Sequence, residues 1–312
     1  MPYQLSEINE KIRRDPAAFL AECDAHYQER IHAAVDKILA RMKESPIVLL
    51  SGPSGSGKTT TAMKIAEALR GMGIGSQSLA MDDYFRTVNP RTAPRTPEGD
   101  IDFESPACLD MDLLGKHLNA LARGEEIHLP RYNFVTRVQS GPIGRPMRLG
   151  KDEVVVCEGI HALNDDIAAY CPDAFRLYIS ARSVVVDGDG QEIFKGTWMR
   201  LLRRLVRDSN FRGTPAAATL DMWANVRRGE KRFISPFKER ANLMFDSSFP
   251  CEVSIMKNFA APLLAAVPEG AERYAEIRSI LPALERFETI DPALLAPESM
   301  LREFIGGGVY SY

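Results

Sequence analysis

The stretch Gly52-Pro53-Ser54-Gly55-Ser56-Gly57-Lys58-Thr59 decides the fold, because it is a complete G-x-x-x-x-G-K-[ST] phosphate-binding loop. The apolar run IVLL at 47–50 precedes it, and residues 59–70 follow with apolar side chains at helical spacing. In a strand–loop–helix unit the glycines let backbone N–H groups surround phosphates, and the helix N-terminus favours negative charge. The loop therefore predicts a nucleotide site, with Lys58 on the β- and γ-phosphates and Thr59 on Mg²⁺. The predicted ATP-binding residues are Gly52, Ser54, Gly55, Ser56, Gly57, Lys58, Thr59 and Thr60.

Two further apolar runs, VVVC at 154–157 and FRLYI at 175–179, alternate with stretches of helical periodicity. Strands that are apolar along their whole length are typical of a parallel sheet covered by helices on both faces. We therefore predict an α/β fold of the P-loop NTPase type, with a doubly wound, mostly parallel sheet flanked by helices. A P-loop domain is expected over 46–257, with a helical N-terminal arm at 1–45 and a helical C-terminal tail at 258–312.

Composition and charge exclude several classes of protein. The 312 residues include 39 Lys and Arg against 42 Asp and Glu, a net charge of −3 with neutral His. This balance argues against a surface built for DNA, and no run approaches the roughly 18 apolar residues of a membrane-spanning helix. The five cysteines are scattered and lack C-x-x-C spacing, so we expect reduced thiols. The sequence predicts a cytoplasmic protein without a membrane or DNA partner.

Two segments between the apolar runs are expected to lack long helices or strands, one as a loop and the other as short extended pieces. Residues 86–106 are rich in Pro, Arg and Thr, and residues 127–150 suggest short extended pieces around a Gly-Pro turn at 141–142. The DGDG at 187–190 could imitate the D-x-x-G switch of a GTPase, but a simple turn is the better account. Since the sequence also has no N-K-x-D guanine signature, a GTPase is disfavoured, while motor ATPases and small-molecule kinases stay open.

Acidic residues follow two of the predicted strands. Asp82 and Asp83 come after the short apolar piece SLAM at 78–81, and Glu158 comes directly after VVVC. In doubly wound sheets the ligands lie beyond the carboxyl ends of the strands, which is where these acids are expected. We assign Glu158 to Mg²⁺ and Asp82 to the proton of an attacking hydroxyl. The alternative for each is a solvated loop acid or a helix N-cap.

An arginine-rich helix is predicted near residue 200. Arg200, Arg203, Arg204 and Arg207 follow i, i+3, i+4, i+7 spacing and share one face, with Leu201, Leu202 and Leu205 on the other. Arg212 follows in a polar turn. Arginines that close over a transferring phosphoryl group stabilise its charge, so we predict a helical lid with Arg204 and Arg207 as catalytic residues. A solvated face, or docking on an anionic membrane or nucleic acid, is the alternative.

The ordered motifs resemble those of the uridine kinase/phosphoribulokinase family, and the resemblance implies that 46–257 is a P-loop kinase domain. The resemblance covers roughly residues 45–255, and the closest likeness is to bacterial uridine-kinase-like nucleoside kinases with EGIHALN, RRGE and a terminal REFIGGG. The motifs that carry it are GPSGSGKTT (52–60), AMDDYF (80–85), IDFESP (101–106), PRYNFVTR (130–137), VVVCEGIHAL (154–163) and RRLVRD…FRG (203–213).

The resemblance implies roles for individual positions. Asp82 matches the general base, Glu158 the magnesium-associated acid, and Arg204, Arg207 and Arg212 the lid and substrate-contacting arginines. Tyr132 and Phe103 match aromatic walls of the acceptor pocket, and Arg137 stands where uridine kinases have a histidine that helps to read the base. Carboxylates flank Phe103 and are suited to accept hydrogen bonds from ribose hydroxyls. The predicted substrate-binding residues are Asp83, Asp102, Phe103, Glu104, Tyr132, Arg137, His161 and Arg212.

Three functions remain open. The first is an ATP- and Mg²⁺-dependent kinase of the 5′-hydroxyl of a nucleoside of the uridine or cytidine type. The second keeps the fold but phosphorylates a sugar phosphate or another alcohol, as phosphoribulokinase does. The third is a nucleotide-binding or RNA-associated module without turnover. The family often forms dimers or tetramers, so the resemblance allows a homo-oligomer.

Overall fold

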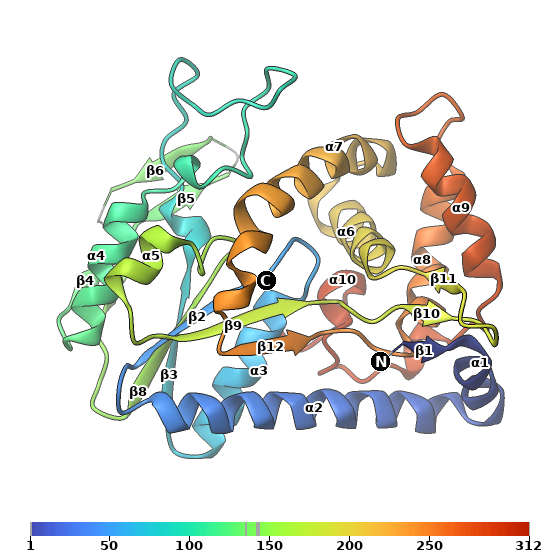
Figure 1. The fold of residues 1–312 in the computed structure, drawn as a ribbon, viewed down its shortest axis with the longest axis horizontal. Helices are drawn as coiled ribbons and strands as arrows, with labels where there is room; N and C mark the ends of the chain where they lie inside the picture. The colour runs from blue at the N-terminus through green and yellow to red at the C-terminus, as the bar shows by residue number, and fades with distance from the viewer. Residues whose placement is uncertain (1, 135, 142–143, 312) are drawn as a thin grey trace.

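The computed structural model describes residues 2–134, 136–141 and 144–311. Its centre is a five-stranded sheet in which all strands run parallel, in the order β12-β9-β2-β8-β3. Figure 1 shows this sheet in the middle of the molecule with helices on both sides of it. The α/β fold predicted from the apolar runs is confirmed. The strands are β2 (Ile47–Ser51), β3 (Gly75–Ala80), β8 (Glu153–Glu158), β9 (Phe175–Ser180) and β12 (Leu243–Asp246).

The central strands are buried on both faces, which explains their continuous apolar sequence. Side chains alternate along β2, so that Val48 and Leu50 join one hydrophobic cluster and Ile47 and Leu49 join the other. The first cluster lies under α2, α3, α6 and α8, and the second under α4 and α5. These helices span α2 Pro16–Arg41, α3 Lys58–Gly71, α4 Met111–Ala122, α5 Asp165–Tyr170, α6 Gly196–Arg212 and α8 Glu252–Ala265.

The N-terminal residues form two helices, as the periodicity indicates, and a short strand precedes them, which it does not indicate. After β1 (Tyr3–Gln4) and α1 (Leu5–Arg14), Asp15 caps α2 by accepting a hydrogen bond from the N–H of Ala18 at 3.0 Å. Helix α2 runs along one side of the molecule (Figure 1) and packs against α3. The small sheet β1-β10-β11, with β10 at Val185–Val186 and β11 at Glu192–Phe194, joins the N-terminus to the middle of the chain.

The C-terminal residues return to the phosphate-binding loop. After α7 (Ala216–Gly229) and α8, the chain forms α9 (Tyr274–Glu285) and the short α10 (Arg302–Ile305), which packs against α6. Met300, Leu301 and Phe304 are fully buried in the same core cluster as α2 and α3. The tail is therefore part of the hydrophobic core that supports the loop.

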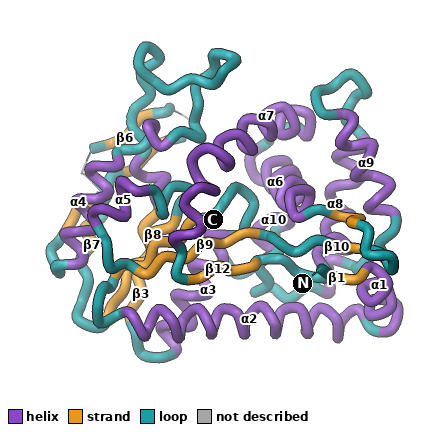
Figure 2. The backbone as a smooth tube through the Cα atoms, in the orientation of Figure 1, coloured by secondary structure: helices purple, strands orange, loops and turns teal. Residues whose placement is uncertain are grey.

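The loop at 86–106 projects from the sheet (Figure 1 and Figure 2), and its first residues hydrogen-bond to residues 137 and 139 of the second segment. Residues 86–106 have no helix or strand until a short 3₁₀ turn at Pro106–Cys108, and the turn at 187–190 is held by the Asp187 carboxylate. Part of the expected Gly141-Pro142 turn lies outside the described residues. The extended pieces are β4 (Ile127–His128), β5 (Arg131–Asn133), β6 (Val138–Ser140) and β7 (Pro146–Met147).

Two predicted boundaries differ slightly from the structure. The strand expected at 78–81 runs from Gly75 to Ala80, because Met81 begins a 3₁₀ turn that carries Asp82 and Asp83. The helix expected at 59–70 begins one residue earlier, at Lys58. Among the described residues, no helix is long and apolar enough to cross a membrane.

Candidate active site

The phosphate-binding loop turns sharply between β2 and α3. Gly55 and Gly57 have φ values of 74° and 77°, in the left-handed region that glycine adopts without strain. At Gly52 a Cβ atom would lie 2.1 Å from the carbonyl oxygen of Ile179, so no side chain fits there. The Lys58 ammonium donates a hydrogen bond to the carbonyl of Pro53 at 3.2 Å, which places it inside the turn. The loop has the form that encloses phosphates before a helix N-terminus.

Three charged groups meet at the carboxyl ends of the central strands. Because β8 pairs with both β2 and β3, Glu158 lies beside Leu50 at one strand end and Ala80 at the other. Asp82 is the second residue after β3, in the 3₁₀ turn Met81–Tyr84, and part of its surface is open to a substrate. The structure thus brings the predicted base, the predicted metal-associated acid and Lys58 together.

These three groups shift each other's pKa. Desolvation lowers the pKa of Lys58, and the charges of Glu158 and Asp82 oppose this. Desolvation raises the pKa of Glu158 to about 7 and raises that of Asp82, while Lys58 acts against both shifts. Arg212 and Arg207 also favour the ionised form of Asp82. A cluster of ionisable groups with perturbed pKa values at the carboxyl ends of parallel strands is typical of an active site.

The donor set beside the loop fits magnesium. The Thr59 hydroxyl donates a hydrogen bond to Oε1 of Glu158 at 3.2 Å, so one hydroxyl and one carboxylate lie side by side. Mg²⁺ prefers hard oxygen ligands and is commonly held by one or two such protein groups together with phosphates. Thr59 and Glu158 are therefore the residues suited to hold the ion.

The arginine face of α6 lies against the loop. Arg200 donates to the carbonyl of Ser54 at 3.2 Å, Arg203 to the carbonyl of Gly55 at 3.2 Å, and Arg204 to the Ser54 hydroxyl at 2.8 Å. The predicted common face exists, and it faces the phosphate site instead of solvent. Sequence reasoning did not select Arg200 and Arg203, although their spacing in the stripe was visible.

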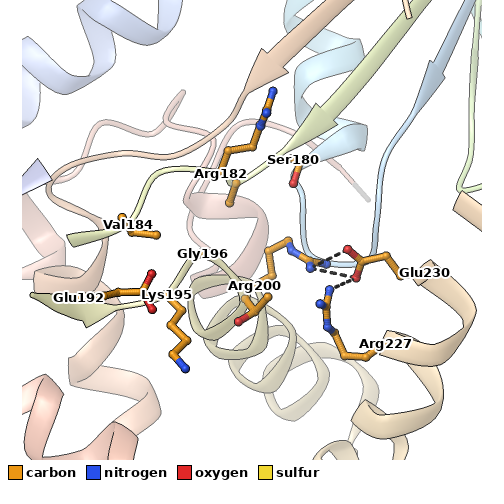
Figure 3. Close-up of a pocket in the computed structure, with 11 residues that line it drawn as sticks. Ser180, Arg182, Val184, Glu192, Lys195, Gly196, Arg200, Arg227 and Glu230 are labelled. Carbon is orange, nitrogen blue, oxygen red and sulfur yellow. Dashed lines mark hydrogen bonds and ion pairs between the residues drawn. The ribbon is translucent and has the colours of Figure 1, made fainter. Parts of the chain in front are cut away.

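The first two arginines are neutralised by buried acids. Arg203 and Glu252 are both fully buried and form a bidentate pair. Arg200 donates to both carboxylate oxygens of Glu230 at 2.9 and 3.0 Å, and Arg227 donates to the same carboxylate (Figure 3). A cavity of about 410 Å³ adjoins this triad at the carboxyl end of β9. Because the Glu230 carboxylate pairs with Arg200 of α6 and with Arg227 of α7, this triad holds α6 against α7.

The last three arginines share a single acid, which sequence reasoning also missed. The Asp208 side chain is 2% exposed and contacts Arg204 at 3.2 Å, Arg207 at 2.9 Å and Arg212 at 3.3 Å. One negative charge between three positive charges leaves an excess of positive charge next to Asp82. Asp208 therefore orients the predicted lid arginines.

Residues 102–104, near the end of the loop at 86–106, lie next to α7. Asp102 is buried and forms an ion pair with Arg228 at 2.9 Å, so one of its carboxylate oxygens is already engaged. Desolvation raises the pKa of Glu104 to about 7, and the charge of Arg204 opposes that shift. A cavity of about 580 Å³ lies here, lined by Thr96, Phe103, Glu104, Arg204 and residues of α7.

The predicted aromatic residues fall into two groups. Tyr132, on β5, is buried against the rings of Phe85 and Phe134 at centroid distances of 5.4 and 4.9 Å. The pKa of Asp83 is raised by desolvation, and a hydrogen bond from the backbone N–H of Tyr132 opposes this. Phe103 is half exposed, and the Arg137 guanidinium lies 5.4 Å from its ring centroid.

The His161 side chain is buried. Its ring contacts Phe233 edge to face at a centroid distance of 6.3 Å. Burial lowers its pKa to about 4, so the imidazole is neutral at physiological pH. This position suits a structural histidine at least as well as a substrate contact.

A further contact to the loop comes from the C-terminus. Glu303 of α10 accepts hydrogen bonds from the Thr60 hydroxyl at 2.6 Å and from the Thr60 N–H at 3.3 Å. Beside it, a cavity of about 470 Å³ is lined by Thr59, Arg207, Arg212 and residues 306–308. No local pattern pairs residues that are 243 positions apart, so the REFIGGG motif marks the segment that holds Glu303 but does not reveal its partner.

The fold and site define a P-loop phosphotransferase. The chain matches the model of the Phosphoribulokinase / Uridine kinase family over residues 47–253, and it belongs to that family. It is an ATP-dependent phosphotransferase, as the sequence motifs predict.

Curated relatives and solved structures are also similar. A "Uridine kinase" from Deinococcus deserti is 30% identical over 199 residues, covering 64% of this chain and 86% of that protein. One from Staphylococcus haemolyticus is 27% identical over 215 residues, covering 69% and 93%. A solved structure titled as a putative fructose transport system kinase from a Silicibacter species is 20% identical with a TM-score of 0.48, and covers 69% of this chain and 98% of its own.

Proposed function

We propose that this protein transfers the γ-phosphoryl group of ATP to the 5′-hydroxyl of a nucleoside of the uridine or cytidine type, with Mg²⁺ as cofactor. The observation that carries the proposal is the meeting of Lys58, Asp82 and Glu158 at the ends of β2, β3 and β8. The relatives named uridine kinase, which this chain matches over most of their length, support the choice of acceptor.

The chain's residues account for each part of the transfer. The oxygen of the acceptor hydroxyl bonds to the γ-phosphorus while the bond from that phosphorus to the bridging oxygen of ADP breaks. Asp82 accepts the proton that the hydroxyl loses. Lys58 and the loop amides hold the phosphates, and Arg204 and Arg207 offset the charge that spreads over the transferring group. When bound, Mg²⁺ neutralises phosphate charge, and Thr59 and Glu158 are the residues that would hold it.

The acceptor side favours a neutral, hydroxyl-bearing molecule. The hydroxyls of Thr96 and Tyr132 are buried, and neither has a hydrogen-bond partner among the residues that the structure describes. Buried polar groups are normally paired, so both are suited to a polar substrate. Arg228 engages one carboxylate oxygen of Asp102, and the other oxygen and the Glu104 carboxyl group can accept hydrogen bonds from hydroxyls. Phe103 supplies an exposed aromatic face for a base.

A sugar phosphate is the second candidate, and one observation favours it. Arg131 and Arg137 lie on or beside the hairpin formed by β5 and β6, near the aromatic group, and could bind a phosphate. Arg137 also takes a left-handed φ of 57°, and its guanidinium lies over the ring of Phe103.

A substrate panel tests the proposal. ADP release is measured with uridine, cytidine, adenosine, ribose 5-phosphate and ribulose 5-phosphate, and the phosphorylated product is identified by ³¹P NMR. We expect turnover with pyrimidine nucleosides. Turnover with pentose phosphates alone would replace the first candidate by the second, and tight ATP binding without any turnover would favour a binding module.

The five cysteines are all free and buried, which is consistent with a reducing compartment. We propose that the protein acts in the cytoplasm.

A further inference from the structure

We propose that the C-terminal segment 300–310 completes the site for the nucleoside end of the donor nucleotide, a purine nucleoside triphosphate. This inference rests on the proposed function, because it assumes that the loop holds the donor's phosphates. The segment lies outside residues 47–253, so the family match says nothing about it.

A cavity adjoins the phosphate-binding loop on the side away from the acceptor. The cavity of about 470 Å³ shares Thr59 with the loop and Arg207 with the arginine face of α6. The acceptor-side cavity lies at Arg204 and Glu104, one turn earlier on α6. A triphosphate held by the loop has its γ-phosphate near Asp82 and the acceptor, so its nucleoside must leave on the other side. The Thr59–Arg207 cavity is open there, and its volume is ordinary for a small-molecule site.

The lining of this cavity suits a purine base. Phe211 is 57% exposed at the end of α6, although large aromatic side chains are normally buried. Its ring edge lies 3.1 Å from the place where a Cβ on Gly306 would be, and Gly306 has a φ of 85°. Glycine at this position leaves the ring uncovered. Tyr310 brings a second ring to the same cavity, with its hydroxyl donating to Glu67 at 2.6 Å.

The glycine turn is fixed in place, so it forms a wall of the cavity. The Arg302 guanidinium donates to the carbonyls of Pro292 at 3.1 Å and Gly306 at 3.3 Å, and also to that of Leu295. The N–H of Val309 donates to the carbonyl of Pro297 at 3.1 Å. These bonds hold both ends of the 306–308 turn against the preceding chain.

The same segment is joined directly to the phosphate-binding loop. Glu303 accepts two hydrogen bonds from Thr60, and Met300 packs so closely on Gly57 that a Cβ there would lie 2.6 Å from its sulfur. Glu303 is a positioning residue, because it ties α10 to α3 and thereby sets the turn beside Thr59. The wall of the cavity and the phosphate loop thus form one unit.

The test compares a donor with a base and one without. Binding of ATP and of inorganic tripolyphosphate is measured by calorimetry for wild type, Phe211→Ala and Tyr310→Ala. Stacking of a base on an aromatic ring contributes about 1–3 kcal/mol, so we expect about 5- to 150-fold weaker ATP binding by Phe211→Ala. Tripolyphosphate binding should stay unchanged. The matched control is Val309→Ala, an exposed residue of the same segment that does not line the cavity.

Each outcome decides the proposal. Selective loss of ATP affinity in Phe211→Ala, with wild-type thermal stability, supports it. Unchanged ATP affinity in both aromatic variants, or equal loss for ATP and tripolyphosphate, overturns it. If wild type binds ATP in this way but phosphorylates no nucleoside, the proposed function fails while this inference stands.

Discussion

The two ends of α6 use the same residue type in different ways. At its N-terminal end, Arg200 and Arg203 each meet a buried carboxylate, and they contact the loop only through backbone carbonyls. At its C-terminal end, Arg204, Arg207 and Arg212 share one carboxylate, that of Asp208. The positive charge is nearly balanced in the first group, where Glu230 also pairs with Arg227, and is in larger excess in the second, where three arginines share one carboxylate.

This difference separates a structural role from a chemical one. A buried ion pair whose charges cancel fixes geometry, and removing one partner leaves an uncompensated charge. Arginines in excess over their acids have charge left for an anionic ligand. We therefore expect substitutions in the first group to act on stability and those in the second to act on catalysis.

The largest effect on catalysis is expected at Asp82, the acid next to the arginines with excess positive charge. Asp82→Asn removes the proton acceptor and should lower kcat by about 10²–10⁴-fold. ATP affinity and thermal stability should be retained, since desolvation already disfavours the Asp82 charge. Steady-state kinetics and calorimetry measure the two quantities. An Asp82→Asn variant with wild-type turnover would remove Asp82 from the mechanism.

A similarly large effect, on stability alone, is expected in the balanced group. Arg203→Met leaves the Glu252 carboxylate buried without its cation and should lower the free energy of unfolding by about 3–5 kcal/mol. The double variant Arg203→Met/Glu252→Leu removes both charges and should regain much of that loss. Urea unfolding measures this. If Arg203→Met lowered kcat while leaving stability intact, the two ends of the helix would not differ as described.

A smaller effect is expected in the group with excess charge. Arg207→Ala should reduce kcat by about 10²–10³-fold, comparable to the loss of one donor to a transition state. Its thermal stability should change little, because Asp208 keeps Arg204 and Arg212 as partners. Arg207→Lys serves as the control that keeps the charge but loses the planar fork. A stability loss as large as that of Arg203→Met would contradict the distinction.

The smallest effect concerns pH. The folded-state pKa of Glu158 is raised to about 7, so its contribution to stability is complete below its ordinary pKa and is lost as the pH rises through about 7. Glu158→Gln removes this loss, so its melting temperature should rise by a few degrees relative to wild type between roughly pH 5 and pH 8. If the melting temperatures of the two proteins changed with pH in the same way, the pKa of Glu158 would not be raised in the folded protein.

Local patterns predicted the parts of the protein that depend on local chemistry. The loop at 52–59, the apolar strands and the acids at the strand ends follow from periodicity and residue type, and the structure has them at those positions. The spacing of the arginines correctly gave a common helix face. Which arginine is neutralised could not be predicted, because Glu230, Glu252 and Asp208 reach them only through the tertiary fold.

The acceptor residues were harder to predict for the same reason. Asp102 has the acidic side chain expected of a sugar-binding group, but its pairing with Arg228 depends on how α7 packs. The pair of Thr60 and Glu303 joins two ends of the chain and leaves no periodic signal. Contacts of this kind depend on how distant parts of the chain pack together in the core. No local sequence pattern specifies that packing.

The hydrogen bond between Tyr27 and Thr61 has a consequence for truncated forms of this protein. The Tyr27 hydroxyl lies 2.6 Å from that of Thr61, which in turn donates to the Gly57 carbonyl at 2.6 Å. A phenol from α2 thus supports the back of the first turn of α3. A fragment cut to the family-matched residues 47–253 would lack this support and would expose the apolar side of α3, so shortened versions should aggregate or bind nucleotide weakly.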